Sequence, residues 1–160
     1  MNLKFGSLGL RNLALGILLS CGRNSDPIQI NALKNFVWPQ NQKLDFEFEP
    51  PTNGNALDLL YQVQIDPSYS YQNIWLTYWL IDPAGDTLTI SKDNLFLFEQ
   101  SGKPIGEQIK ERQFVDAYFL RNIKLSKPGK YHLSLQHSMR QDSLRGVQSI
   151  GLRWQEAESD

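Results

Sequence analysis

The sequence contains a single cysteine, only two histidines and no excess of charge of either sign. One cysteine cannot form an intrachain disulfide, and it cannot supply a multi-thiolate zinc site. The net charge is −1, from 16 Lys and Arg against 17 Asp and Glu. The chain therefore has no overall positive charge that would attract the phosphates of nucleic acid. These shortages exclude a disulfide framework, a thiolate zinc centre and a basic nucleic-acid-binding protein.

Long hydrophobic runs are also missing. The apolar run from Asn12 to Leu19 is too short to cross a hydrocarbon core of about 30 Å, which needs roughly 20 apolar residues. It follows Lys4 and Arg11, and no acidic residue precedes it. A basic start followed by a short apolar segment is typical of a secretory signal, so residues 1–20 are predicted to be a cleaved signal peptide.

The end of this signal places the one cysteine. Leu18, Leu19, Ser20 and Cys21 have the spacing of a lipobox, with a branched apolar residue three places before the cysteine and a small residue directly before it. We therefore predict lipid on Cys21; the alternative is an ordinary secretory signal with an incidental cysteine. Two or more acyl chains hold a protein firmly to a membrane, so Cys21 makes the membrane the first predicted partner.

The remaining chain suits one domain. With 160 residues, of which 41% are hydrophobic and 11% aromatic, it can bury one core of ordinary size. Residues 21–32 are predicted to be the lipidated cysteine and a polar tether, residues 33–156 a single domain and residues 157–160 a tail. Removing residues 1–20 takes away two basic and no acidic side chains, which leaves a net charge of −3.

Alternation of apolar and polar residues dominates the predicted domain and indicates strands with one wet face. Residues 71–81 are apolar on both alternating faces, which predicts a central strand covered on both sides. Asp82-Pro83-Ala84-Gly85 predicts a reverse turn and a hairpin, while residues 59–65 fit either a strand or a short helical turn. The other predicted strands span residues 44–48, 86–90, 95–98, 114–120, 131–135 and 147–154.

About seven to eight strands joined by turns, without a long amphipathic helix, predict an all-β fold, an antiparallel β-sandwich.

The histidines and acidic residues give little support for a catalytic or metal site. His132 and His137 are five residues apart along a strand, so their side chains point to opposite faces and cannot share a metal. Pairs such as Glu47 with Glu49, or Asp82 with Asp86, are common on strand edges and in turns. Hence no metal, no cofactor and no enzyme activity are predicted.

Two surface features remain as candidates for binding. Residues 136–140 break the alternation where a strand should end, and we interpret this break as a bulge or interaction rim. Trp75, Trp79, Tyr69 and Tyr71 can form either part of the core or an exposed aromatic platform for sugar or protein. The rim residues singled out are Gln136, Met139, Arg140 and Arg153.

Several fragments occur in the order found in one protein family. They are residues 71–76 (YQNIWL), 86–87 (DT), 128–131 (PGKY), 136–140 (QHSMR) and 146–153 (GVQSIGLR). Together with the lipobox and the chain length, they make the region from about residue 38 to 154 resemble the gliding-motility lipoprotein GldH family of Bacteroidota. Residues 99–106 depart from the Gly-rich stretch usual in that family.

The resemblance implies a non-enzymatic envelope lipoprotein required for gliding, in bacteria whose gliding machinery is linked to type IX protein secretion. Its expected partners are therefore other gliding or type IX secretion proteins of the envelope, and its expected place is the periplasmic face of the outer membrane rather than the inner membrane. The competing hypothesis is a lipid-anchored, glycan-binding β-sandwich, which requires at least two of Tyr69, Tyr71, Trp75 and Trp79 to be exposed and coplanar.

Overall fold

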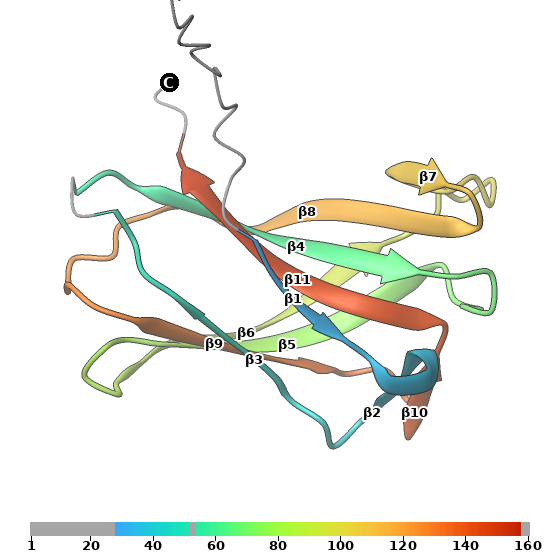
Figure 1. Cartoon of the computed structure of the whole chain (residues 1–160), viewed down its shortest axis with the longest axis horizontal. Coiled ribbons are helices and arrows are strands. Elements are labelled where there is room, and N and C mark those ends of the chain that lie inside the picture. The colour runs from blue at the N-terminus through green and yellow to red at the C-terminus, as the bar shows by residue number, and fades with distance from the viewer. Residues whose placement is uncertain (1–27, 52–53, 158–160) are drawn as a thin grey trace, which may run out of the picture.

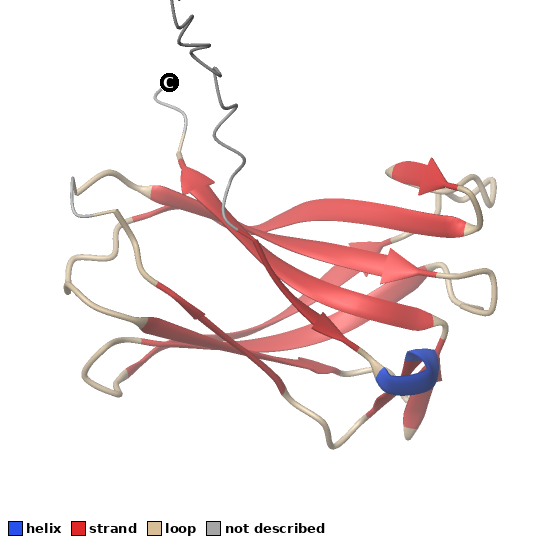
Figure 2. Cartoon of the chain, in the orientation of Figure 1, coloured by secondary structure: helices blue, strands red, loops and turns tan. Residues whose placement is uncertain are grey.

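A computed structural model describes residues 28–51 and 54–157 of the chain. Cys21, with the predicted signal peptide, lies outside the described residues. Two antiparallel sheets face each other across one core (Figures 1 and 2). The described part contains no α-helix, only a three-residue 3-10 turn, η1 (Lys34–Phe36), and none of its helical segments is long and apolar enough to cross a membrane. The predicted antiparallel β-sandwich is confirmed.

The first sheet has five strands in the order β1-β11-β4-β8-β7, and the second has four in the order β3-β9-β5-β6. A separate pair, β2 (Val37–Pro39) and β10 (Ser143–Arg145), lies at one end of the sandwich (Figure 1). The five-stranded sheet comprises β1 (Ile28–Ala32), β11 (Val147–Glu156), β4 (Leu57–Ile65), β8 (Arg112–Ile123) and β7 (Glu107–Ile109). The four-stranded sheet comprises β3 (Leu44–Phe48), β9 (Tyr131–His137), β5 (Asn73–Ile81) and β6 (Thr87–Phe96).

The core lies between the facing sides of the two sheets, and the alternation in the sequence determines which side chains enter it. In β3, Leu44, Phe46 and Phe48 are buried while Asp45 and Glu47 are exposed. Burying apolar surface at about 25 cal/mol per Å² is the main force holding such a sandwich together. The largest fully buried side chains include Trp38, Tyr61, Tyr131 and Phe46.

The predicted hairpin between β5 and β6 is confirmed. The carboxylate of Asp82 accepts hydrogen bonds from the backbone N–H groups of Ala84 and Asp86, at 2.9 and 3.0 Å. Gly85 has a φ of +89°, a conformation that favours glycine because it has no Cβ. The turn residues recognised in the sequence therefore form the turn.

The tether prediction needs correction at its C-terminal end. Residues 28–32, assigned to the tether, form β1, which pairs with β11 from Ile28 opposite Arg153 to Ala32 opposite Ser149. The polar residues of this segment, Gln29 and Asn31, suggest a solvated tether, but in the structure their side chains point toward β3. The amides of Gln29 and Asn31 instead bond the backbone of β3.

The number of strands was underestimated, and two predicted strands are one. Residues 28–51 and 54–157 form eleven strands, three of which (β2, β7 and β10) have only three residues and are too short for a detectable alternation. Residues 87–90 and 95–96 of these segments belong to the single strand β6, because the polar stretch between them continues the pairing with β5, while residues 97 and 98 lie beyond its end. The undecided segment 59–65 is strand, within β4.

Strand β5 is central, between β9 and β6, as predicted, but only one of its faces is covered. Ile74, Leu76, Tyr78 and Leu80 are buried, whereas Trp75 on the other face is 38% exposed. The expectation that both faces are covered was wrong because Trp75 and Trp79 are apolar and aromatic, as core residues are, but lie on the outer face of the sheet. Continuous buried stretches occur instead in β11, at residues 147–152, and in β4, at residues 57–61.

Candidate functional site

The outer face of the four-stranded sheet carries the most distinctive surface of the described residues. Side chains alternate along β5, so Trp75, Thr77 and Trp79 project from the same outer face. Cross-strand pairing places Lys92 of β6 and Gln136 of β9 on either side of Thr77. This arrangement sets a row of polar and cationic side chains beside two tryptophans.

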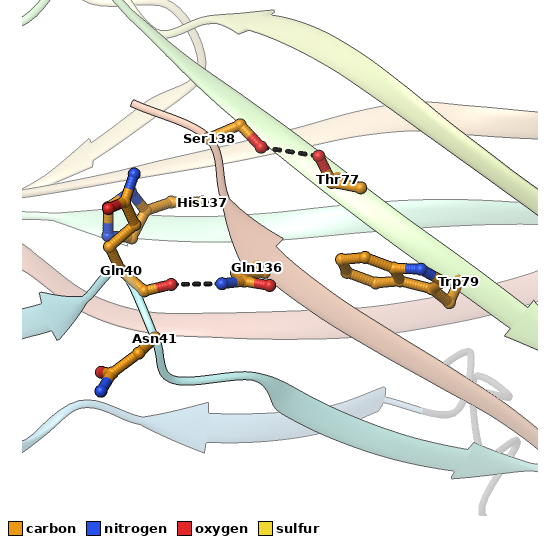
Figure 3. Close-up of a pocket in the computed structure, with 7 residues that line it drawn as sticks. All are labelled: Gln40, Asn41, Thr77, Trp79, Gln136, His137 and Ser138. Carbon is orange, nitrogen blue, oxygen red and sulfur yellow. Dashed lines mark hydrogen bonds between the residues drawn. The ribbon is translucent and has the colours of Figure 1, made fainter. Parts of the chain in front are cut away.

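A shallow depression of about 450 Å³ lies beside Trp79 (Figure 3). The side-chain amide of Gln136 donates a hydrogen bond to the backbone carbonyl of Gln40, in the loop between β2 and β3. Thr77 and Ser138 share a hydrogen bond of 2.6 Å between their hydroxyl oxygens. The depression is therefore lined by the Trp79 indole, by His137 and by residues with amide and hydroxyl groups.

A second depression, of about 520 Å³, lies beside Trp75 and shares Ser138 with the first. The backbone N–H of Trp75 donates a hydrogen bond to Sδ of Met139 at 3.3 Å. Met139 is buried, while Arg140 next to it is exposed. We call the two adjoining depressions the tryptophan groove and define it by Trp75, Thr77, Trp79, Gln136 and Ser138.

Three of the four rim residues predicted from the sequence lie together at the tryptophan groove, and the fourth does not. Gln136, Met139 and Arg140 all border the tryptophan groove. Arg153 lies in β11 of the opposite sheet, where its guanidinium pairs with the carboxylate of Asp116. Arg153 therefore belongs to a different surface.

The four aromatic residues proposed as a platform do not form one exposed surface. Tyr69 is buried, its hydroxyl donates to the backbone carbonyl of Asn73 at 2.8 Å, and burial raises the pKa of its phenol. Tyr71 is half-buried and meets the Tyr69 ring edge-on, with centroids 5.7 Å apart. Trp79 lines the first depression, and Trp75 and Tyr71 line the second. Tyr69 thus belongs to the core.

Two lysines at the groove, Lys43 and Lys92, were not predicted from the sequence. Nζ of Lys43 lies 3.9 Å from the centre of the Trp79 ring, and Nζ of Lys92 lies 5.3 Å from that of Trp75. Cations are attracted to the negative face of an indole ring. Lys43 and Trp79 are far apart in the sequence and meet only through sheet pairing, so no local signal pointed to them.

Three of the four acidic side chains considered in the sequence, Asp82, Asp86 and Glu47, form ion pairs with lysines. The buried carboxylate of Asp82 bonds Nζ of Lys127, which holds the pKa of Asp82 below its usual range and raises that of Lys127. Glu47 lies 3.4 Å from Nζ of Lys130 and 3.6 Å from Nδ1 of His132. These carboxylates are paired with cations or with a histidine at the surface.

Each of the two histidines has a described partner other than a serine, Glu47 for His132 and the Trp38 carbonyl for His137. His132 is exposed and His137 is buried, on opposite faces as predicted. Nε2 of His137 donates to the backbone carbonyl of Trp38 at 3.0 Å, and burial lowers its pKa. The Ser134 hydroxyl donates to Asp45. Within residues 28–51 and 54–157, no three His, Cys, Asp or Glu side chains come together as metal ligands would.

Fold and surface together define an all-β sandwich domain with a shallow aromatic and polar groove on one outer face. The family model described as GldH lipoprotein matches residues 28–154. This chain belongs to the GldH lipoprotein family, and it is accordingly a gliding-motility lipoprotein of the cell envelope.

A relative in Christiangramia forsetii (strain DSM 17595 / CGMCC 1.15422 / KT0803), named "Gliding motility lipoprotein GldH homolog", is 21% identical over 131 residues, which cover 76% of this chain and 79% of the relative. Among solved structures, dimeric latent PorU from Porphyromonas gingivalis has a TM-score of 0.36 at 10% identity, covering 82% of this chain and 13% of that one. The subviral particle of infectious bursal disease virus VP2 has a TM-score of 0.33 at 14% identity, covering 92% of this chain and 36% of that one.

Proposed function

We propose that this lipoprotein is a non-enzymatic docking protein of the gliding and type IX secretion machinery. Lipid on Cys21 holds it at the periplasmic face of the outer membrane, and its sandwich domain binds another protein of the envelope. The docking surface consists of the free edge of β6 and the apolar side chains beside that edge.

The observation that carries this proposal is the state of the sheet edges. Strand β6 has ten residues and, within the described residues, pairs with β5 alone. Its outer face exposes Leu88 to 48%, Ile90 to 60% and Phe96 to 50%. Natural proteins usually shorten, cover or charge such edges because an unpaired strand invites another. A long edge with exposed apolar residues suits a partner that adds a strand.

The other edge strands of the two sheets are shorter, with five residues in β1 and β3 and three in β7. At β3, the second edge of the same sheet, the amides of Gln29 and Asn31 bond the backbone of Glu47 and Asp45. At β7, one of the two edges of the five-stranded sheet, the strand is only three residues long. With ten residues, β6 is the longest of the four edge strands among the described residues.

The position of the anchor is consistent with docking near a membrane. Strand β1 begins at Ile28, seven residues after Cys21. A fully extended chain covers at most about 3.6 Å per residue, so the first strand starts within about 25 Å of the predicted lipid. The domain thus stays close to the membrane surface and to other proteins anchored there.

Co-purification tests the docking surface. The tagged full-length protein and its Ile90→Lys variant are captured from detergent-solubilised envelope of a gliding Bacteroidota host, and the bound proteins are identified by mass spectrometry. The matched control is Ile109→Lys, because Ile109 on β7 is 49% exposed but lies on the other sheet. We expect gliding or secretion proteins with wild type and control but not with Ile90→Lys. Equal recovery with all three would contradict docking at β6.

A further inference from the structure

The tryptophan groove has the shape and length of a site for an extended chain. Trp75 and Trp79 are four residues apart on one strand, which separates them by about 13 Å along β5. Trp75, together with Tyr71, lines one of the two adjoining depressions and Trp79 lines the other; their volumes are about 520 and 450 Å³. The hydrogen bond between Thr77 and Ser138 lies where the depressions meet. A ligand long enough to contact both rings must cross this polar centre.

The groups around the rings are suited to hydroxyl-rich ligands. Asn41 and Gln136 line the first depression and Asn73 and Gln141 the second. Side-chain amides both donate and accept hydrogen bonds, as sugar hydroxyls do. Binding sites commonly combine aromatic surface for contact area with a few polar groups for orientation. Two aromatic walls with amides between and around them therefore match successive units of a polysaccharide.

The charge at the groove is positive. Neither depression is lined by an acidic side chain, and the second is lined by Lys92 and Arg140. Lys43 lies over Trp79 in the same way that Lys92 lies over Trp75. No ion pair is described for these three cations within residues 28–51 and 54–157, unlike Lys127 and Lys130. In a chain of net charge −1, such a concentration of unpaired cations favours an anionic ligand.

We propose that the tryptophan groove binds an acidic polysaccharide whose sugar units carry carboxylates. The sugar rings stack on Trp75 and Trp79, and their carboxylates pair with Lys43, Lys92 and Arg140. An exposed lysine held over an indole ring is easily displaced, so each ammonium moves from the ring to a carboxylate while a sugar takes its place. This activity goes beyond protein docking at β6 and does not depend on it.

Binding of defined oligosaccharides to the purified full-length protein in detergent tests the proposal without any partner protein. The probe is hexagalacturonate, followed by tryptophan fluorescence and calorimetry, and cellohexaose is the uncharged probe of equal length. We expect hexagalacturonate to bind at least tenfold more tightly than cellohexaose, and its affinity to fall as salt is raised. Equal affinity for the two, or tighter binding of an oligothymidylate of similar length, would overturn the proposal.

Variants locate the site. Trp75→Ala and Trp79→Ala should each weaken hexagalacturonate binding at least tenfold. Lys92→Glu, on an exposed side chain outside the core, should do the same without endangering the fold. The matched control is Tyr118→Ala, since Tyr118 is 47% exposed on β8 and carries Arg121 over its ring at 4.6 Å. Binding that survives all three groove variants, or that is lost with Tyr118→Ala alone, would show that the groove is not the site.

Discussion

The side-chain amide of Gln29 pairs with the backbone of Glu47 as a neighbouring strand would. Its Nε2 donates to the Glu47 carbonyl, and its Oε1 accepts from the Glu47 N–H at 3.0 Å. One side chain thus occupies both hydrogen-bonding groups of an edge residue in β3. The two sheets are joined at this side by amides, and β6 is left as the long edge that is open to a partner.

Replacing this amide tests its contribution to stability. Gln29→Ala removes two hydrogen bonds at a partly exposed position, each contributing about 0.5–1.5 kcal/mol net. We expect the free energy of unfolding to fall by about 1–2 kcal/mol in urea denaturation. Gln108→Ala, at an exposed position of β7, should change it by less than about 0.5 kcal/mol. Similar values for both variants would contradict the role assigned to Gln29.

A second prediction concerns the glycine before β11. Gly146 has a φ of +83°, and a Cβ added there would lie 2.6 Å from Cα of Tyr69. Gly146→Ala should therefore destabilise the protein by about 2 kcal/mol or more, since both backbone strain and a backbone clash act against it. Gly85→Ala is the control, because its φ is +89° and no atom lies within 4 Å. Thermal denaturation should show a distinctly smaller decrease for Gly85→Ala.

The buried histidine predicts how stability depends on pH. Burial lowers the pKa of His137 below 6.5 in the folded protein, so the unfolded chain binds a proton first as the pH falls. Stability is then lost below about pH 6.5, by at most about 1.4 kcal/mol per pH unit from this group. His137→Gln, which retains an N–H donor for the Trp38 carbonyl, should show a shallower loss between pH 6.5 and 5 in urea denaturation. An unchanged slope would mean that another group governs this range.

The ion pair at the β5–β6 turn predicts a further loss of stability as the pH falls, in a lower pH range than that of His137. Lys127 lowers the pKa of Asp82, so its contribution is present above about pH 3.8 and disappears as the pH falls further. Lys127→Ala should reduce stability at pH 7 and flatten the loss of stability in acid. Lys130→Ala, which removes the exposed pair with Glu47, should have a smaller effect at pH 7. Denaturant titrations at pH 7 and pH 3 distinguish the two variants.

The sequence predicted the features that local patterns determine. Alternation in residues 44–48 and 131–135 identified strands and their buried faces, and the Asp-Pro-Ala-Gly turn identified a hairpin. Strand β1 was missed because Gln29 and Asn31 bond another strand instead of water. The groove could not be predicted as a unit, since Lys43, Trp79 and Gln136 meet only through the register of three strands.

The most direct test of an anchored docking protein compares wild type with Cys21→Ala in a gliding Bacteroidota host. Intact mass, membrane fractionation and co-purifying proteins are measured for both. The account predicts lipid on the wild-type N-terminal cysteine, membrane association and recovery of gliding or type IX secretion proteins, and the loss of all three in Cys21→Ala. Wild-type protein that carries no lipid, or that is lipidated but recovered alone, would contradict it.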